Sequence, residues 1–148
     1  MRNLLFILLP VFVLGCSRNG DDVSKTRTGE PCGEAVQVTA KSFSTAESDP
    51  FSITSASIKG DCLTVTVGAS GCSSDWEKVE VLHGISLTAD GLPQNRLKIV
   101  LSNKTGDCAT SFSKTLQFDL YPLRQKGTNK LTILLYGYDK TLEYAYGN

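Results

Sequence analysis

The sequence predicts an all-β fold, a mostly antiparallel β-sandwich of about eight short strands, with a small β-barrel as the alternative. Apolar and polar residues alternate with a period of two over most of the chain after Cys32. The alternating stretches recur roughly every 8 to 14 residues, between clusters of Gly, Asn, Asp and Ser. The only helical segment expected is one turn over residues 73–78, which Ser73 or Ser74 could cap.

The first half of the domain is expected to contain four strands. A polar break at residues 44–50 separates the first from the second. Lys59-Gly60-Asp61 is a turn signal between two stretches rich in β-branched residues, which is typical of a hairpin. Gly68-Ala69-Ser70-Gly71 then breaks the alternation. The four strands are expected at residues 36–40, 51–58, 63–67 and 76–83.

Four more strands are expected in the second half. Residues 89–93 form a loop before the alternation resumes at Leu97. Turn signals follow at residues 103–107, 126–129 and 138–140, where Gly, Asn, Asp or Lys cluster. The strands between them are expected at residues 97–101, 112–120, 131–135 and 142–146.

The first 15 residues predict a signal peptide. Arg2 precedes an apolar stretch at residues 4–14 that is shorter than the roughly 20 residues needed to span a bilayer. Its end, Val13-Leu14-Gly15-Cys16, resembles the lipobox of bacterial lipoproteins. The resemblance implies cleavage before Cys16 and attachment of lipid to its thiol. The alternative is an ordinary secretory signal in which Cys16 lies near the cleavage site by chance.

Residues 16–31 contain little to bury and many turn formers, so we expect a flexible tether there. Residues 32–148 then form one disulfide-bonded domain. A lipid on Cys16 would hold this domain on a membrane of the bacterial cell envelope, at the periplasmic face of the outer membrane or at the cell surface.

The cysteine count supports the export signal. The chain has five cysteines, and lipidation of Cys16 leaves an even set, which in an oxidising compartment predicts disulfides. We favour Cys32–Cys62 with Cys72–Cys108, because Cys72 and Cys108 each follow a turn-like segment. The rival pairing is Cys62–Cys108 with Cys32–Cys72.

The last ninety or so residues carry a fainter resemblance. Gly71-Cys72, Trp76-Glu77, Gly106-Asp107-Cys108 and residues 116–120 (LQFDL) are similar to positions in uncharacterised exported bacterial lipoproteins. The resemblance implies no activity.

Charge and motifs exclude several functions. Fifteen Lys and Arg are scattered among fifteen Asp and Glu, whereas a nucleic-acid site needs clustered cations. His83 is the only histidine, and Gly68-Ala69-Ser70-Gly71 lacks the spacing of the serine nucleophile elbow. We therefore predict no catalytic residues, no metal site and no cofactor.

Binding remains. Loops on a rigid β scaffold often carry recognition, and an exposed Trp suits a glycan or a protein partner. The candidate residues are Ser73, Ser74, Asp75, Trp76 and His83. The alternative for Trp76 is a place in the core, and for His83 a strand-end or surface position without a task.

The sequence thus favours a non-enzymatic, lipid-anchored envelope protein that binds a protein or an envelope polymer. One alternative is an inhibitor or immunity-type protein that blocks the active site of a hydrolase with a protruding rigid loop. The other is a hydrolytic enzyme.

Overall fold

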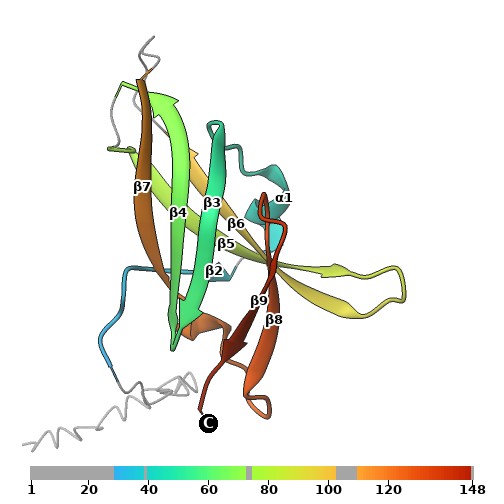
Figure 1. Cartoon of the computed structure of the whole chain (residues 1–148). Helices are drawn as coiled ribbons and strands as arrows, with labels where there is room; N and C mark the ends of the chain where they lie inside the picture. The colour runs from blue at the N-terminus through green and yellow to red at the C-terminus, as the bar shows by residue number, and fades with distance from the viewer. Residues whose placement is uncertain (1–28, 39, 73–74, 103–109, 148) are drawn as a thin grey trace, which may run out of the picture.

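In the computed structural model, which describes residues 29–38, 40–72, 75–102 and 110–147, two β-sheets pack face to face (Figure 1). The first sheet has the strand order β1-β7-β4-β3 and the second β2-β5-β6-β8-β9. The sheets do not close on each other, so the predicted sandwich is confirmed and the barrel is not formed. The elements are β1 (Glu34–Ala35), β2 (Gln37–Val38), α1 (Ala40–Thr45), β3 (Phe51–Lys59), β4 (Cys62–Gly71), β5 (Lys78–Leu87), β6 (Pro93–Ser102), β7 (Thr110–Asp119), the 3-10 helix η1 (Tyr121–Leu123), β8 (Lys130–Leu135) and β9 (Thr141–Ala145).

Most neighbouring strands are antiparallel, as expected. The pairs β3–β4, β4–β7, β5–β6 and β8–β9 are antiparallel, whereas β1–β7, β2–β5 and β6–β8 are parallel. The predicted turn at Lys59-Gly60-Asp61 joins β3 to β4, and Gly60 adopts a φ of 58°, which glycine tolerates without steric cost.

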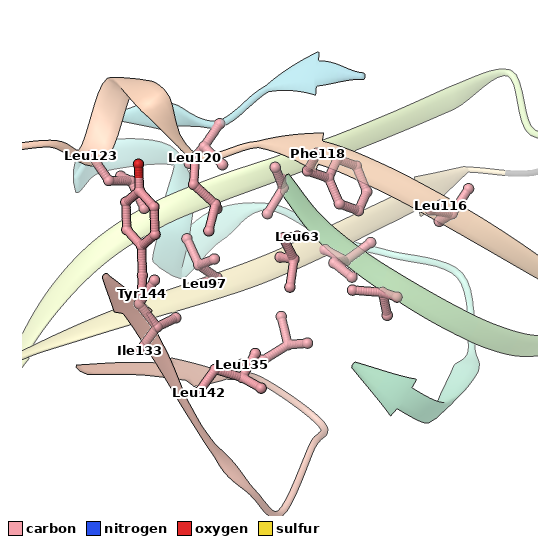
Figure 2. Packing of buried hydrophobic residues seen from close by; sticks show 14 of the residues in the cluster. Leu63, Leu97, Leu116, Phe118, Leu120, Leu123, Ile133, Leu135, Leu142 and Tyr144 are labelled. Atoms are coloured by element: carbon pink, nitrogen blue, oxygen red, sulfur yellow. The ribbon is translucent and has the colours of Figure 1, made fainter. Parts of the chain in front are cut away.

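The core lies between the sheets (Figure 2). Alternate residues of β4, β6, β7, β8 and β9 point inward, which is the burial pattern that the period of two predicts. The inward residues include Leu63, Val65, Val67, Leu97, Ile99, Leu101, Leu116, Phe118, Ile133, Leu135, Leu142 and Tyr144.

The expected first strand at residues 36–40 is wrong. The chain crosses there from one sheet to the other, with β1 in the first sheet, β2 in the second and Val36 buried between them. Helix α1 then occupies part of the expected strand and of the polar break. Six residues do not form a stable helix alone, so α1 depends on tertiary contacts such as that of Phe43 with Gly84.

Several strands are longer than the sequence pattern predicts. β4 continues through Gly68 to Gly71, because these residues pair with β7. β5 continues past His83 to Leu87, and β6 begins at Pro93. Asp75 and Trp76 are not helical and β5 begins at Lys78, so the expected helical turn is absent from the described part of residues 73–78.

Other expectations fall outside the described residues. These are the signal peptide, Cys16, most of the tether, Ser73 and Ser74, and the turn at residues 103–107 with Cys108. Among the described residues, no helix has the length and apolar character needed to cross a membrane.

Candidate functional site

The β5–β6 hairpin projects from the side of the sandwich (Figure 1, yellow-green to yellow). β2 pairs with β5 only up to His83, and β8 pairs with β6 only from Asn95 onward. Residues 84–94, which we call the hairpin tip, therefore extend beyond the neighbouring strands β2 and β8 and pair only with each other. A two-stranded ribbon alone is marginally stable in water, so its conformation needs other support.

The hairpin tip exposes large apolar side chains. Ile85 is 63% exposed, Leu87 70% and Leu92 63%. Ile85 and Leu87 continue the phase of Val81, whose side chain is fully buried in the core. The core-facing row of β5 thus runs past the point where the other sheet covers it, and its last members meet solvent.

The end of the tip is a hydrogen-bonded loop. The Thr88 N–H donates to the Leu92 carbonyl at 2.8 Å, and the Leu92 N–H donates to Thr88 Oγ1 at 3.0 Å. Gly91 donates its N–H to the Thr88 carbonyl at 3.0 Å and has a φ of 77°, which suits glycine.

Helix α1 supports the base of the tip from the opposite face. A Cβ added to Gly84 would lie 2.7 Å from Cγ of Phe43, so the ring packs directly on the β5 backbone. This close packing supports the base of the ribbon, and the face that carries Ile85 and Leu87 stays exposed.

His83 lies at the base of the tip and is buried. It is 7% exposed, and its Nε2 lies 3.1 Å from Oδ1 of Asn95. The sequence-based interpretation of His83 as a strand-end or surface residue is therefore wrong, because β5 continues beyond it and β2 pairs beside it.

The structure does not bring Trp76 and His83 together. They are seven positions apart along an extended segment, which at about 3.3 Å per residue separates them by roughly 20 Å. Trp76 is half-buried, with its ring centroid 5.5 Å from that of Phe112 and 5.4 Å from Nζ of Lys114. Asp75 is exposed and lies 3.5 Å from the same Nζ. Binding by these residues stays a prediction.

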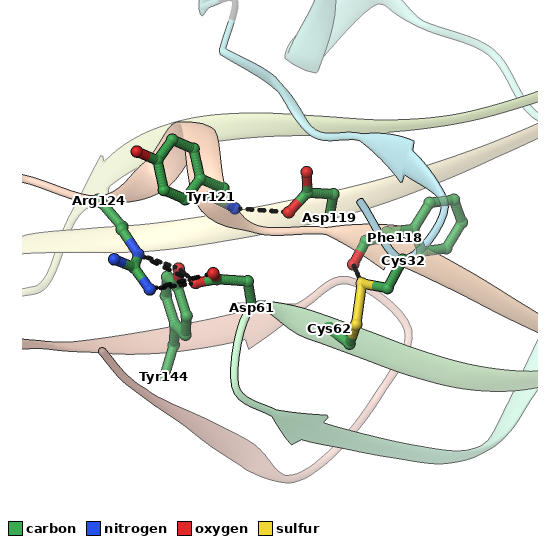
Figure 3. The surroundings of a disulfide bond; sticks show 8 residues. All are labelled: Cys32, Asp61, Cys62, Phe118, Asp119, Tyr121, Arg124 and Tyr144. Carbon is green, nitrogen blue, oxygen red and sulfur yellow. Dashed lines mark hydrogen bonds and ion pairs between the residues drawn. A yellow bond between two sulfur atoms is a disulfide. The ribbon is translucent and has the colours of Figure 1, made fainter. Parts of the chain in front are cut away.

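A second polar feature joins three distant parts of the chain (Figure 3). The Arg124 guanidinium donates from Nε and Nη2 to the two carboxylate oxygens of Asp61, each at 3.0 Å. The Tyr144 hydroxyl donates to Oδ1 of Asp61 at 2.5 Å. We call these three side chains the polar cluster; they tie the β3–β4 turn to the segment after η1 and to β9.

The surroundings of the polar cluster shift two pKa values. Burial first, and then the hydrogen bond to Asp61, raises the pKa of Tyr144 well above its ordinary value. Burial by itself would lower the pKa of Arg124, but hydrogen bonds to Tyr144 and Asp61 outweigh it and raise that pKa. Tyr144 is therefore neutral and Arg124 charged at physiological pH.

Aromatic rings flank the guanidinium of Arg124. Its Cζ lies 5.0 Å from the ring centroid of Tyr121 and 5.4 Å from that of Tyr146. Nη1 also donates to the Gly147 carbonyl at 3.2 Å. With its donors thus engaged, Arg124 fastens the C-terminal segment and offers little to a ligand.

The disulfide Cys32–Cys62 lies beside the polar cluster, with its Cα atoms 5.8 Å apart (Figure 3). It fastens the start of the domain to β4 and is incompatible with the rival pairing. Cys72 is also disulfide-bonded. Because Cys108 lies outside the described residues, the bond Cys72–Cys108 stays a prediction.

The described residues hold no group of three or more His, Cys, Asp or Glu side chains that could bind a metal ion. The exposed side chains of Ile85, Leu87 and Leu92 make the hairpin tip the candidate functional site, which the sequence pattern placed partly in a loop. The sequence did carry a signal for this longer strand, because Ile85 and Leu87 fall on the same alternating positions as Val79 and Val81.

The chain matches no protein-family model and no curated protein. Its fold is similar to that of solved structures. A protein of unknown function, DUF1344, from Bacteroides vulgatus has a TM-score of 0.50 at 15% identity, over 78% of this chain and 57% of that one. A putative toxin-related protein from Parabacteroides distasonis has a TM-score of 0.48 at 14% identity, over 76% of this chain and 59% of that one. A NigD-like immunity protein from Bacteroides caccae also has a TM-score of 0.48, at 13% identity, over 75% of this chain and 58% of that one.

The chain thus spans less than three fifths of each of these proteins. At such identities the likeness concerns only the arrangement of the sheets, and it assigns no functional role to any residue of this chain.

Proposed function

We propose that this chain is a non-enzymatic binding module, held on a membrane of the bacterial cell envelope by lipid on Cys16, that captures a protein with its hairpin tip. The observation that carries the proposal is the exposure of Ile85, Leu87 and Leu92 on a projecting ribbon that α1 and the end loop hold in place.

The apolar character of the tip favours a protein over an envelope polymer. Full burial of a Leu or Ile side chain contributes about 1.5–3 kcal/mol, and a partner groove can bury several at once. Val38, which is exposed and pairs with His83, adds an apolar side chain beside the base. Residues 84–94 contain no aromatic ring on which a sugar could stack.

The shape of the tip favours an inhibitor or immunity-type role among protein-binding roles. A ribbon two strands wide can enter an active-site cleft that a whole sandwich cannot, and pre-ordering by α1 and Gly91 lowers the entropy lost on binding. The partner in this case is a hydrolase whose cleft the tip blocks.

Photo-crosslinking in intact cells tests the proposal. A benzoylphenylalanine at position 87 should form an adduct with one specific protein, and the same group at Thr132, exposed on β8, should not. Ile85→Asp should abolish the adduct at position 87 without lowering the unfolding midpoint, because that side chain is exposed. Equal adducts at both positions, or an adduct that survives Ile85→Asp, would contradict the proposal.

The inhibitor role and the anchor have separate tests. If the crosslinked partner is a hydrolase, the purified chain should abolish its activity at about equimolar ratio and Leu87→Asp should restore it. For the anchor, Cys16→Ser should release the protein from the membrane fraction; retention there would refute lipidation.

A further inference from the structure

Most open strand edges of this protein carry a feature that hinders pairing with another chain. An open edge presents backbone groups to which a further strand can bind, and charges, prolines or bulges prevent this. β3 has a register shift between Ile53 and Ser55, and the tip end of β6 begins with Pro93, which lacks an N–H. Charged side chains lie on the other long open edges of the described chain: Lys114 on β7, Lys78 and Glu80 on the first part of β5, and Glu143 on β9.

One edge of the hairpin tip has none of these features. β2 pairs with β5 only as far as His83, so no strand of the described chain lies beside residues 84–88, which we call the open edge. Their sequence, GISLT, holds no charged residue and no proline. The pairing of β5 with β6 shows no register shift. The open edge can therefore accept a further strand.

The backbone of the open edge suits an antiparallel neighbour. The Thr88 N–H donates across the hairpin to the Leu92 carbonyl at 2.8 Å. Backbone groups alternate between the two edges of a strand, so those of Ile85 and Leu87 point to the open edge. Each of these two residues can exchange a pair of hydrogen bonds with a residue placed opposite.

We propose that the open edge pairs antiparallel with the open edge of a second copy of this chain, about a two-fold axis beside Ser86. The pairing concerns the same tip as the proposed function and adds regulation to it, because the second copy covers the tip until a captured protein displaces it. This competition rests on the proposed function, whereas the pairing itself does not.

The two ends of the open edge determine the register. At one end Val38 of β2 occupies the place beside His83, and at the other the turn of the hairpin begins after Thr88. Two stretches of residues 84–88 fit between these limits when Ser86 lies opposite its counterpart. Ile85 of each copy then lies opposite Leu87 of the other.

This arrangement favours a second copy over an unrelated strand. Two identical edges match in length, and a two-fold axis makes the contact self-complementary. Ile85 and Leu87 of the two copies lie side by side on one face, where apolar pairs stabilise a sheet. The edge carries no charge, so its repetition across the axis brings no like charges together. Two marginal ribbons become one sheet of four strands with an apolar face.

Ser86 gives an independent reason. Its Oγ is buried and has no hydrogen-bond partner within the described chain, although the residue as a whole is only half-buried. On the axis, Ser86 and its counterpart form a pair without backbone hydrogen bonds, in which side chains are closest. A rotation about the Cα–Cβ bond then lets one hydroxyl donate to the other.

Ser86→Cys in the full chain, exported by intact cells, tests the pairing. The Cα atoms on the axis lie about 4.5 Å apart, within the range of about 4.4–6.8 Å for disulfides, so a disulfide-linked dimer should form. Gln94→Cys is the matched control. Gln94 pairs with Ser86 and is likewise half-buried, but it lies one strand further from the axis, about 15 Å from its counterpart. Ser86→Cys should give at least about tenfold more dimer on non-reducing electrophoresis. No dimer, or equal amounts, would overturn the proposal.

Two additions to Ser86→Cys test which side chains form the contact. Leu87→Asp should abolish the dimer, because it places a carboxylate between the apolar side chains of the two copies. Leu92→Asp should leave the dimer intact, because Leu92 is similarly exposed but lies outside the open edge. Loss of the dimer with both variants, or with neither, would contradict the proposed register.

Hydrogen exchange tests the unchanged chain. An interface of residues 84–88 is small, so we expect a dissociation constant on the order of 100 µM. The amide hydrogens of Ile85 and Leu87 should exchange several-fold more slowly at about 1 mM than at about 10 µM protein, while that of Gly91, bonded within its own loop, should not change. Equal rates at both concentrations would refute the pairing even if Ser86→Cys does not fold.

The pairing and the proposed function can fail separately. If benzoylphenylalanine at position 87 joins only to a second copy, capture of another protein is refuted and the pairing is supported. If it joins another protein while Ser86→Cys gives no dimer, the pairing is refuted and capture is supported.

Discussion

Replacing Arg124 with Met should lower the free energy of unfolding by about 2–3 kcal/mol. The substitution removes two charge-assisted hydrogen bonds of 3.0 Å and leaves the Asp61 carboxylate without its cation. Breaking a fully buried ion pair costs about 3–5 kcal/mol. The side chains are 24% and 15% exposed, so water offsets part of that cost.

The ion pair between Lys130 and Glu143 is a matched control in the second sheet. Its atoms are closer, at 2.6 Å, but the side chains are 51% and 67% exposed. Lys130→Met should therefore cost less than about 0.5 kcal/mol. Arg124→Lys should cost an intermediate amount, because an ammonium keeps the charge but loses the two-pronged geometry and the stacking on Tyr121.

Urea denaturation followed by near-ultraviolet circular dichroism measures all three variants, since urea, unlike guanidinium, does not screen charge. A double-mutant cycle with Asp61→Asn isolates the coupling, for which we expect about 1–2 kcal/mol. If Arg124→Met and Lys130→Met cost the same, burial does not strengthen the Arg124–Asp61 pair and the reasoning fails.

Three further outcomes are expected. The pKa of Tyr144 is raised in the folded state, so its protonated hydroxyl contributes fully to the free energy of unfolding below the unfolded-state pKa of about 10. That contribution is lost as the pH rises toward the higher folded-state pKa. In urea titrations above about pH 10, Tyr144→Phe should therefore lose stability less steeply than the unchanged protein. Replacing both Cys32 and Cys62 with Ala should cost about 3–4 kcal/mol, because the bond closes a loop across 30 positions, and an unchanged urea midpoint would contradict this. Gly84→Ala should cost about 1–3 kcal/mol by displacing the Phe43 ring, and adding Phe43→Leu should recover part of it in the same assay.

The sandwich could be predicted because its evidence is local. Leu63, Val65 and Val67 alternate with polar residues, and in a strand this places them on one face. All three are fully buried. Lys59-Gly60-Asp61 likewise determines its own turn, since glycine reaches the φ of 58° at no steric cost.

Helix α1 and the polar cluster depend instead on contacts between distant residues. α1 forms where Phe43 contacts Gly84 of β5, and no pattern within its six residues predicts that contact. Asp61 and Arg124 are 63 positions apart, and Asp61 and Tyr144 are 83. A spacing that long carries no periodic signal, so only the tertiary fold reveals the cluster.

The hairpin tip could be predicted from the sequence only in part. The alternation that buries Val81 continues through Ile85 and Leu87, so the sequence carried a signal for the longer strand, although the expected strand ended at His83. Exposure was not visible, because it depends on where the opposite sheet ends rather than on any residue of β5. Phe43 packs on Gly84 at the base of this row, and Ile85 and Leu87 beyond it are exposed. Exposed apolar side chains that gather on one projecting edge are typical of an interaction surface, and the proposed capture of a protein partner rests on this edge.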